Sequence, residues 1–461
     1  MPVPVSRIPL ASLLLALPLA AGAADFVVDS TLDDGPGSLR AAIAQANAAP
    51  GADRILFAEA LAGQTLSLQA PAPLIGDAVE IDGPVGGAAI VQGSGADRLL
   101  QIDAPAGTSV TLRDLVFRGG NAYDGGCIRV RRANLLLQRV RLSGCQATRG
   151  GGLASVDGAI AEIEDSRIDG NTASYAGGGL YALGPLFVGD SEIDHNRLEG
   201  PGYVGGGGVA AYAADLAPLV LIVGSHLHHN VAVTSTPEEA GSGSTGGALD
   251  SSRGMLRVEN SSFYANEAGS GAAINRTGMS GEEQHARIVG STIARNIGAS
   301  ALAVLVGDLY VGHSTISANR ARPQGWNRAA LDTWAVVPVR LFNSVVAGNE
   351  VGDVYSGGAP VEADYCYVGQ AGAGSFDPSA PGTNVFGGAP LLGALRWNGG
   401  PTPTMRPLSG SPLIDRGTDA DRPATDQRGY ARLVGATVDI GSVEDDGDRL
   451  FDDAFEPGLA D

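Results

Sequence analysis

A seven-residue stretch that recurs along the middle of this chain constrains its fold more than any other feature. It reads DSRIDGN at 165–171, DSEIDHN at 190–196 and GSHLHHN at 224–230. Shorter copies follow, in which Ser, any residue, an apolar residue and two further residues precede an Asn. A short unit repeated at unequal intervals is typical of a solenoid, in which each unit forms one turn.

Each repeat also contains the signals of short strands. Alternating runs such as LVLIVG and MLRVEN precede the Ser positions, and glycine clusters such as GGGLYA follow the Asn positions. A period of two bounded by Gly or Asp predicts strands separated by turns. Stacking of the turns would align the apolar residue of each motif into one core. The sequence therefore predicts a mainly β fold, a right-handed single-stranded parallel β-helix.

The Asn of the motif is predicted to form a ladder inside the coils. Equivalent residues of neighbouring turns lie about 4.8 Å apart, where side-chain amides can donate to and accept from one another. The predicted ladder consists of Asn171, Asn196, Asn230, Asn266, Asn296, Asn319 and Asn349.

Two of the three cysteines fall at related positions of the repeat. Cys127 replaces a glycine in GGCIRV, and Cys145 takes the ladder position in LSGCQ, so both are predicted on successive turns. That placement makes them candidates for a disulfide, with two separate buried thiols as the alternative. Cys366 is the odd cysteine.

The start of the chain predicts export. Residues 1–24 combine Arg7, an apolar run and a small-residue site at Ala23, which are the parts of a secretory signal peptide. The run is too short to span a membrane, and we predict no transmembrane segment in the mature chain. The mature protein is expected to be extracellular, on the outer surface or periplasmic.

Both ends of a solenoid need covers, because a terminal coil exposes apolar core and an unpaired strand edge. The stretch GSLRAAIAQAN places Leu39, Ile43 and Ala46 on one helical face after Ser38, which predicts a capping helix. The predicted division is a signal peptide (1–24), an N-terminal cap (25–75), β-helix coils (76–370), a C-terminal capping segment (371–444) and an acidic tail (445–461). The tail lacks a complete EF-hand spacing and is interpreted as solvated.

The charge of the chain limits its partners and its chemistry. The formal net charge is −20 and the sequence contains no lysine. Nucleic acids and anionic membranes require clustered cations, so we predict no nucleic-acid partner. A lysine base is excluded from any catalytic mechanism.

Both terminal segments resemble parts of known secreted proteins. DDGPGSLRAAIAQANAAPGADRILF resembles the CSLREA-type N-terminal segment of secreted bacterial β-helix proteins, although Gly37 and Ala41 stand where that name has Cys and Glu. PLLGALRWNGGPTPTMRPLSGSPLIDRG and TDQRGYARLVGATVDIGSVE resemble the choice-of-anchor Q segment that closes many of them. The resemblance implies an exported or surface-associated β-helix protein and supplies no catalytic residues.

The first three repeats form the chemically densest part of the chain. Their alignment predicts one column of Asp169, Asp194 and His228, a second of His195 and His229, and a third of Arg167, Glu192 and His226. Two carboxylates one strand spacing apart would suit a retaining glycosidase, or a hard cation such as Ca²⁺ at Asp169 and Asp194. No other cofactor is predicted. The alternative is a solvated surface with ordinary cross-strand pairs, such as Arg167 beside Glu192.

Two tryptophans are further candidates. Trp326 and Trp334 in PQGWNRAALDTWAVV could stack on sugar rings. The alternative is that both anchor loops or pack on the outside of the coils.

Two functions follow from these features. The first is a non-catalytic, adhesin-like exported protein whose flank binds polysaccharide or cell-surface glycan. The alternative is a polysaccharide lyase or glycoside hydrolase of the β-helix type that acts on acidic polysaccharide, with Asp169, Asp194 and His228 as candidate catalytic residues. An enzyme would require the variable loops after Asn196, after Asn230 and from Arg276 to wall a cleft around the column.

Overall fold

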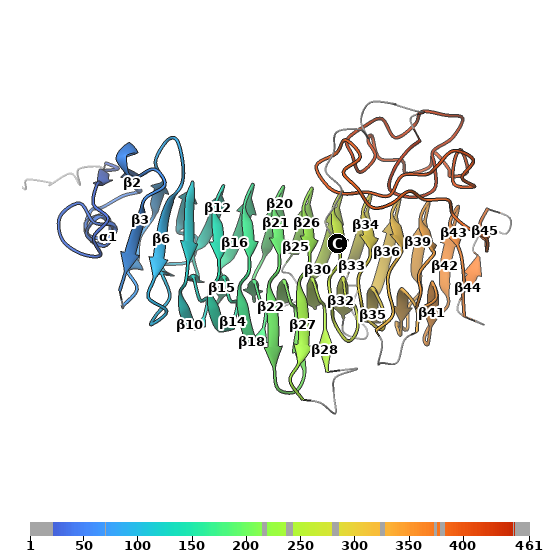
Figure 1. The fold of residues 1–461 in the computed structure, drawn as a ribbon, viewed down its shortest axis with the longest axis horizontal. Coiled ribbons are helices and arrows are strands. Elements are labelled where there is room, and N and C mark those ends of the chain that lie inside the picture. Colours follow the sequence, from blue (N-terminus) through green and yellow to red (C-terminus); the bar gives the residue numbers. More distant parts are fainter. Residues whose placement is uncertain are drawn as a thin grey trace, which may run out of the picture.

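The chain folds into a parallel β-helix (Figure 1). The computed structural model describes residues 22–69, 71–213, 219–236, 243–278, 285–322, 328–372, 376–378, 383–445 and 447. Four sheets run along the solenoid, here called A, B, C and D, and their strands pair in parallel with strands of the neighbouring turns. In the middle of the molecule each turn passes through sheets A, B, D and C in that order. The predicted fold class is confirmed.

Sheets A and B have the most strands. Sheet A has 14 strands, in the order β1 (Asp25–Val28), β2 (Asp53–Phe57), β5 (Val79–Asp82), β8 (Ser109–Arg113), β12 (Asn134–Gln138), β16 (Ile160–Glu164), β20 (Leu186–Gly189), β25 (Leu219–Val223), β30 (Met255–Glu259), β33 (His285–Val289), β36 (Asp308–Gly312), β39 (Val339–Phe342), β42 (Val361–Asp364) and β44 (Phe376–Pro378). Sheet B has 13 strands, in the order β3 (Thr65–Leu68), β6 (Ala89–Gly93), β9 (Leu115–Arg118), β13 (Arg141–Ser143), β17 (Arg167–Asp169), β21 (Glu192–Asp194), β26 (His226–His228), β31 (Ser262–Tyr264), β34 (Thr292–Ala294), β37 (Thr315–Ser317), β40 (Val345–Ala347), β43 (Tyr367–Val368) and β45 (Val385–Phe386).

Sheets C and D complete the turns. Sheet C has 11 strands, in the order β4 (Leu74–Ile75), β7 (Leu100–Asp103), β11 (Ile128–Arg131), β15 (Leu153–Val156), β19 (Leu180–Ala182), β24 (Val209–Tyr212), β29 (Leu249–Ser252), β32 (Ile274–Thr277), β35 (Leu302–Val306), β38 (Leu331–Thr333) and β41 (Val354–Ser356). Sheet D has 7 strands: β10 (Asn121–Asp124), β14 (Gln146–Arg149), β18 (Thr172–Ala176), β22 (Arg197–Gly200), β23 (Val204–Gly205), β27 (Val231–Thr234) and β28 (Ser244–Thr245). Strand pairing thus begins within residues 25–75, expected as a cap, and extends past residue 370.

A short helix lies at the start of the solenoid (Figure 1). Helix α1 (Leu39–Ala48) begins after Ser38, whose Oγ accepts a hydrogen bond from the backbone N–H of Ala41 at 3.2 Å. Its buried face includes Leu39 and Ile43 and packs against β1, β2 and β4. The predicted capping helix is therefore present. A single 3₁₀ turn, η1 (Glu59–Leu61), follows it, and neither described helix is long and apolar enough to cross a membrane.

Two ladders inside the coils explain why the motif keeps both its Ser and its Asn. The Nδ2 of Asn196 donates to the Oδ1 of Asn230 at 3.0 Å, and the same bond joins each neighbouring pair from Asn171 to Asn349 at 2.9–3.1 Å. The Ser of each motif accepts from the backbone N–H of the preceding Ser, as Ser225 does from Ser191 at 3.1 Å. Both ladders satisfy polar groups that the core would otherwise leave unpaired.

The residue before each Ser and each Asn has a left-handed backbone conformation. Asp165 and Asp190 before Ser have φ of 47° and 46°, and His195 and His229 before Asn have φ of 52° and 53°. Glycine, Asn and Asp adopt this region at low cost, which accounts for their frequency before the Ser. Histidine at the second position is costlier and is held there by the buried ladder on its C-terminal side.

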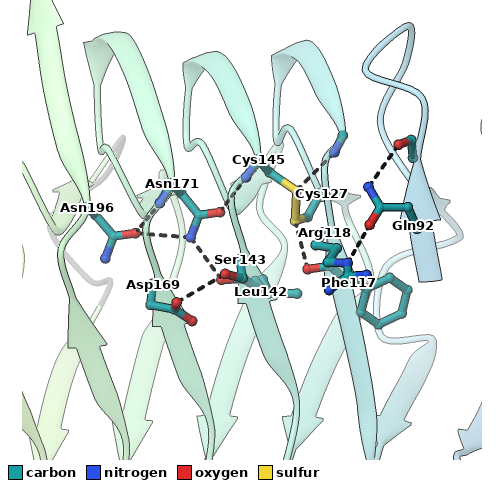
Figure 2. The surroundings of a disulfide bond; sticks show 12 residues. Gln92, Phe117, Arg118, Cys127, Leu142, Ser143, Cys145, Asp169, Asn171 and Asn196 are labelled. Atoms are coloured by element: carbon teal, nitrogen blue, oxygen red, sulfur yellow. Dashed lines mark hydrogen bonds between the residues drawn. A yellow bond between two sulfur atoms is a disulfide. The ribbon is translucent and has the colours of Figure 1, made fainter. Parts of the chain in front are cut away.

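A disulfide lies at the N-terminal end of the Asn ladder (Figure 2). Cys127 and Cys145 are joined, with their Cα atoms 5.5 Å apart. The backbone N–H of Cys145 donates to the Oδ1 of Asn171 at 2.9 Å, so the cysteine occupies the rung next to the first Asn of the ladder. Cys366 is a buried free thiol, and burial raises its pKa to about 12.

The C-terminal part of the chain folds back over the outside of the solenoid (Figure 1). We call residues 388–445 the closing segment. The backbone O of Pro403 accepts from the Oγ of Ser262 at 2.5 Å, and the Nδ2 of Asn343 donates to the O of Thr418 at 2.7 Å. Leu413 and other apolar residues of the segment pack on the outer face of β40 and β43. The closing segment therefore covers the flank of the later coils in sheet B and does not lie across the open end.

Candidate functional site

The candidate columns lie on the outer face of sheet B. The sheet B strands β13, β17, β21 and β26 have three residues each, of which the middle one points into the core, where Ile168, Ile193 and Leu227 are fully buried. The first and third residues point outward. The register pairs Asp169 with Asp194 and Asp194 with His228, so the first predicted column lies on adjacent strands.

The two aspartates of this column are paired with arginines one strand earlier. Arg141 donates to both carboxylate oxygens of Asp169 at 2.7 Å, and Arg167 donates to those of Asp194 at 2.9 and 2.8 Å. Arg167 also lies 3.5 Å from Glu192, the cross-strand neighbour that the sequence suggested. Such bidentate pairs use the oxygens that Ca²⁺ or a nucleophilic carboxylate would need.

Four histidines continue the same surface, on β26 and on the turns after β21 and β26. The Nε2 of His228 is 2.9 Å from a carboxylate oxygen of Glu192, and its Nδ1 is 2.8 Å from the Nδ1 of His229. The Nδ1 of His195 is 2.6 Å from an Asp194 oxygen, and the ring of His195 stacks on that of His229 with centroids 4.9 Å apart. Each imidazole therefore contacts another imidazole or a carboxylate.

Burial and the neighbouring charges set the protonation of this cluster. Burial lowers the pKa of His226 to about 4, and burial together with His228 and His195 lowers the pKa of His229 to about 4. Burial would raise the pKa of Asp194, but hydrogen bonds from Arg167 and His195 outweigh it and hold that pKa below its ordinary value. His226 and His229 are thus uncharged at neutral pH beside an ionised Asp194.

A depression of about 370 Å³ opens beside the column, lined among others by Arg141, Arg167, Glu192 and His226. The closing segment reaches this place, because the ring of Trp397 meets that of His226 edge-on at 5.4 Å. Among the described atoms, the Nδ1 of His226 is buried without a hydrogen-bond partner. The arrangement offers planar polar groups and one aromatic ring along an open surface.

The described parts of the variable loops do not wall this surface. The segment after Asn196 forms β22 and β23 of sheet D, and these strands project on the side of the solenoid opposite the closing segment (Figure 1). The loops after Asn230 and from Arg276 lie partly outside the described residues. In the described part of the chain, the wall nearest to the column is the closing segment.

The remaining candidates lie elsewhere. Trp334 follows β38 in sheet C, where the Arg328 guanidinium lies 4.7 Å from its ring and Tyr355 5.9 Å away, so it is not part of the sheet B surface. Trp326 lies outside the described residues, as do most of the predicted signal peptide and of the predicted acidic tail.

The sequence predicts which residues share a column, but it does not predict the contacts that two further residues make with them. Arg141 belongs to an earlier repeat that lacks the motif Asn, and Trp397 is far away in the closing segment. The clustering of histidines was a usable signal, since four of the six in the chain fall within residues 195–229.

The fold and this surface define the class of the protein, a parallel β-helix with a covered and an open flank. No family model matches the chain, and no curated protein is similar to it. Among solved structures it is similar to pectate lyase Pel9A, with 14% identity over 92% of this chain and 97% of that one and a TM-score of 0.36. It is also similar to jun a 1, the major allergen from cedar pollen, with 14% identity over 68% and 71% of the two chains and a TM-score of 0.34.

Proposed function

We propose that this protein is exported and binds polysaccharide or cell-surface glycan, without catalysis, on the outer face of β13, β17, β21 and β26. The export signal predicted at 1–24, and the resemblance of the terminal segments to CSLREA-type and choice-of-anchor Q segments, support a location outside the inner membrane. An extended surface on a long solenoid suits a long polymer, because successive rungs repeat about every 4.8 Å.

One observation carries the proposal. The outward side chains from Arg141 to His226 form a continuous row of polar groups held by bidentate pairs, and the closing segment meets this row at His226 through Trp397. Groups that are already fixed by such pairs lose little conformational freedom on binding. Trp397 at the end of the row adds an aromatic surface of the kind that packs on sugar rings.

The pairing of the aspartates supports binding over hydrolysis. A retaining glycosidase needs one ionised carboxylate free to attack the sugar. Asp169 and Asp194 instead each accept two hydrogen bonds from a guanidinium. This surface therefore supports recognition better than it supports two-carboxylate catalysis.

A direct test uses purified mature protein and a panel of soluble polysaccharides, namely polygalacturonate, alginate, hyaluronan and neutral dextran, in affinity electrophoresis. We expect retardation by at least one polymer, reduced about ten-fold or more in affinity in Arg167→Gln and in Arg141→Gln. The matched control is Arg340→Gln, because Arg340 forms a similar exposed pair with Glu362 on sheet A. Equal binding by all three variants would place the site elsewhere.

A polysaccharide lyase is the second candidate, and one observation favours it. His226 is uncharged and lines the depression together with the guanidinium of Arg167, a combination that could remove a proton beside a uronate carboxylate. The same incubations, followed at about 235 nm with and without Ca²⁺, decide between the two. Unsaturated products that vanish in His226→Ala would establish the lyase, whereas binding without products supports recognition alone.

A further inference from the structure

Four histidines gather on two consecutive turns of sheet B. His195 follows β21, His226 and His228 belong to β26, and His229 follows it. The register stacks β26 directly on β21, so the two turns after these strands are neighbours. Histidine is scarce in this chain, with six residues in all. The cluster is therefore a local concentration of the side chains that late transition metals prefer.

Three of these rings present nitrogens to one another. One nitrogen each of His195, His228 and His229 lies within 4.8 Å of the other two, and the His228 Nδ1 is 2.8 Å from the His229 Nδ1. A tetrahedral ion with metal–nitrogen bonds of about 2.0–2.1 Å holds its nitrogens about 3.3 Å apart. The His228–His229 separation is shorter than that value and the other two separations are at most 4.8 Å, so small rotations of the rings would bring the three nitrogens to metal-binding distance.

Carboxylates orient two of the rings from outside the trio. Glu192 lies 2.9 Å from the Nε2 of His228. A neutral His228 that donates its proton there carries its free lone pair on Nδ1, which faces His229. Asp194 lies 2.6 Å from the Nδ1 of His195 in the same manner. Carboxylate partners of this kind fix the tautomer and the ring plane of metal-bound histidines.

The site is buried at His228 and exposed to solvent at His195. His228 is buried and stacks on Tyr264, with centroids 4.6 Å apart. His195 is 60% exposed, which leaves a path from solvent and room for a fourth ligand. The left-handed backbone of His195 and His229 is held by Asn196 and Asn230 of the buried ladder. Two of the three ligand-bearing positions therefore have fixed backbones.

We propose that His195, His228 and His229 bind one divalent late transition-metal ion, of the zinc and copper class, through three imidazole nitrogens, with Glu192 and Asp194 as positioning residues. Imidazole suits Zn²⁺ and Cu²⁺, whereas Ca²⁺ and Mg²⁺ prefer oxygen ligands. The fourth position is open to water or to a donor group of another molecule. The proposal does not depend on glycan binding.

A second trio, formed by Glu192, His226 and His228, also brings three donor atoms within 4.8 Å. It is less suited, because Glu192 is already engaged by His228 and lies 3.5 Å from Arg167. A cation there would face the positive guanidinium directly, while the histidine trio is separated from Arg167 by the carboxylate of Asp194. The two trios share His228 and can be distinguished by the other histidines.

The test measures metal binding by mature protein made without a polyhistidine tag. Equilibrium dialysis against Zn²⁺ or Cu²⁺ should give one bound ion per chain, and Ca²⁺ at the same concentrations should give none. We expect His195→Ala and His229→Ala to bind Zn²⁺ at least about 100-fold more weakly and Glu192→Gln about 10–100-fold more weakly. Circular dichroism of each variant verifies that the β-helix is intact.

The matched control is His285→Ala, a histidine on β33 of sheet A, which should bind as the unchanged protein does. A Co²⁺-loaded sample gives a second readout, since a site with three nitrogens and one further ligand produces a tetrahedral visible spectrum that His229→Ala should lose. The proposal is overturned if folded protein binds no Zn²⁺ or Cu²⁺. It is equally overturned if His226→Ala abolishes binding while His195→Ala and His229→Ala retain it.

Discussion

The outer face of sheet B has two halves that differ in chemistry, although both are built from the same repeat. On the open half, the outward residues are Arg141, Ser143, Arg167, Asp169, Glu192, Asp194, His226 and His228. On the covered half, the equivalent residues are Ser262, Tyr264, Thr292, Ala294, Thr315, Ser317, Val345 and Ala347. The inward residue is apolar on both halves. Inward positions thus specify the solenoid, and outward positions reflect whether solvent or the closing segment lies over them.

Desolvation explains the contrast. A charge beneath the closing segment would have to leave water without a partner, which is costly, whereas a hydroxyl needs only one or two hydrogen bonds. Thr292 meets this need with the Oε1 of Gln427 at 2.6 Å and the Oγ of Ser442 at 3.0 Å. On the open half the buried carboxylates have charged partners instead, as Asp194, 1% exposed, has in Arg167, whose side chain is 42% exposed.

The largest effect is expected when a charge is placed on the covered half of sheet B. Thr292→Arg buries an unpaired guanidinium, and we expect it to lower the free energy of unfolding by about 3–5 kcal/mol. Limited proteolysis should then cut the closing segment while the coils persist. Ser143→Arg is the control, because its neighbour in register on β9 is already Arg118. Comparable losses for both variants would refute the difference between the halves.

The Asn ladder should contribute equally to stability beneath the open half and beneath the covered half of sheet B. Asn196→Ala, under the open half, and Asn296→Ala, under the covered half, each leave several buried backbone and amide groups unpaired. We expect each to cost about 3 kcal/mol in chemical denaturation. A much larger effect at Asn296 would show that the closing segment contributes to the ladder.

A milder change tests the contact that attaches the closing segment. Gln427 is buried and its Nε2 donates to the Oγ of Ser262 at 2.8 Å and to the O of Ser261 at 3.2 Å. Gln427→Ala should lower the free energy of unfolding by about 1–2 kcal/mol and increase amide exchange in the closing segment. Unchanged exchange would mean that other contacts hold the segment.

The smallest effect concerns pH at the junction of the closing segment and the coils. Burial and Arg432 lower the pKa of His313 from 6.5 to about 3, so its stabilisation is present above 6.5 and is lost as the pH falls through 3. Burial and Asp439 raise the pKa of Glu444 from 4.5 to about 7, so its stabilisation is present below 4.5 and is lost as the pH rises through 7.

Together these two groups predict a melting temperature that is highest at about pH 5–6 and lower by a few degrees at pH 8. In Glu444→Gln, which keeps a neutral group at this position, the loss above pH 6 should disappear. Scanning calorimetry at several pH values measures both. A wild-type profile that rises steadily to pH 8 would contradict the raised pKa of Glu444.

The solenoid was predictable because its determinants are local and repeated. The apolar middle residue, the Ser and the Asn recur in fixed order, and stacking converts them into a core and two ladders. The same register brings Asp169, Asp194 and His228 together, so the column could also be predicted. Ser38 signalled the helix through its capping position.

The site was only partly predictable, because its remaining parts depend on contacts between distant residues. Gln427 contacts Ser261 across 166 residues, and no local pattern indicates on which coils the closing segment will lie. The diagonal pairs, such as Arg141 with Asp169, depend on side-chain reach between rungs and not on register alone. The position of Trp397 beside His226 depends both on where the closing segment lies and on how far side chains reach.

The most direct test of the central claim, that the open half of sheet B is the binding surface, is hydrogen exchange followed by mass spectrometry. Mature protein would be compared with and without a polysaccharide that retards it in electrophoresis. The account predicts slower exchange in peptides that contain the turns after β13, β17, β21 and β26, with no change on sheet A or sheet D. Protection confined to sheet D, or to the covered half, would contradict it.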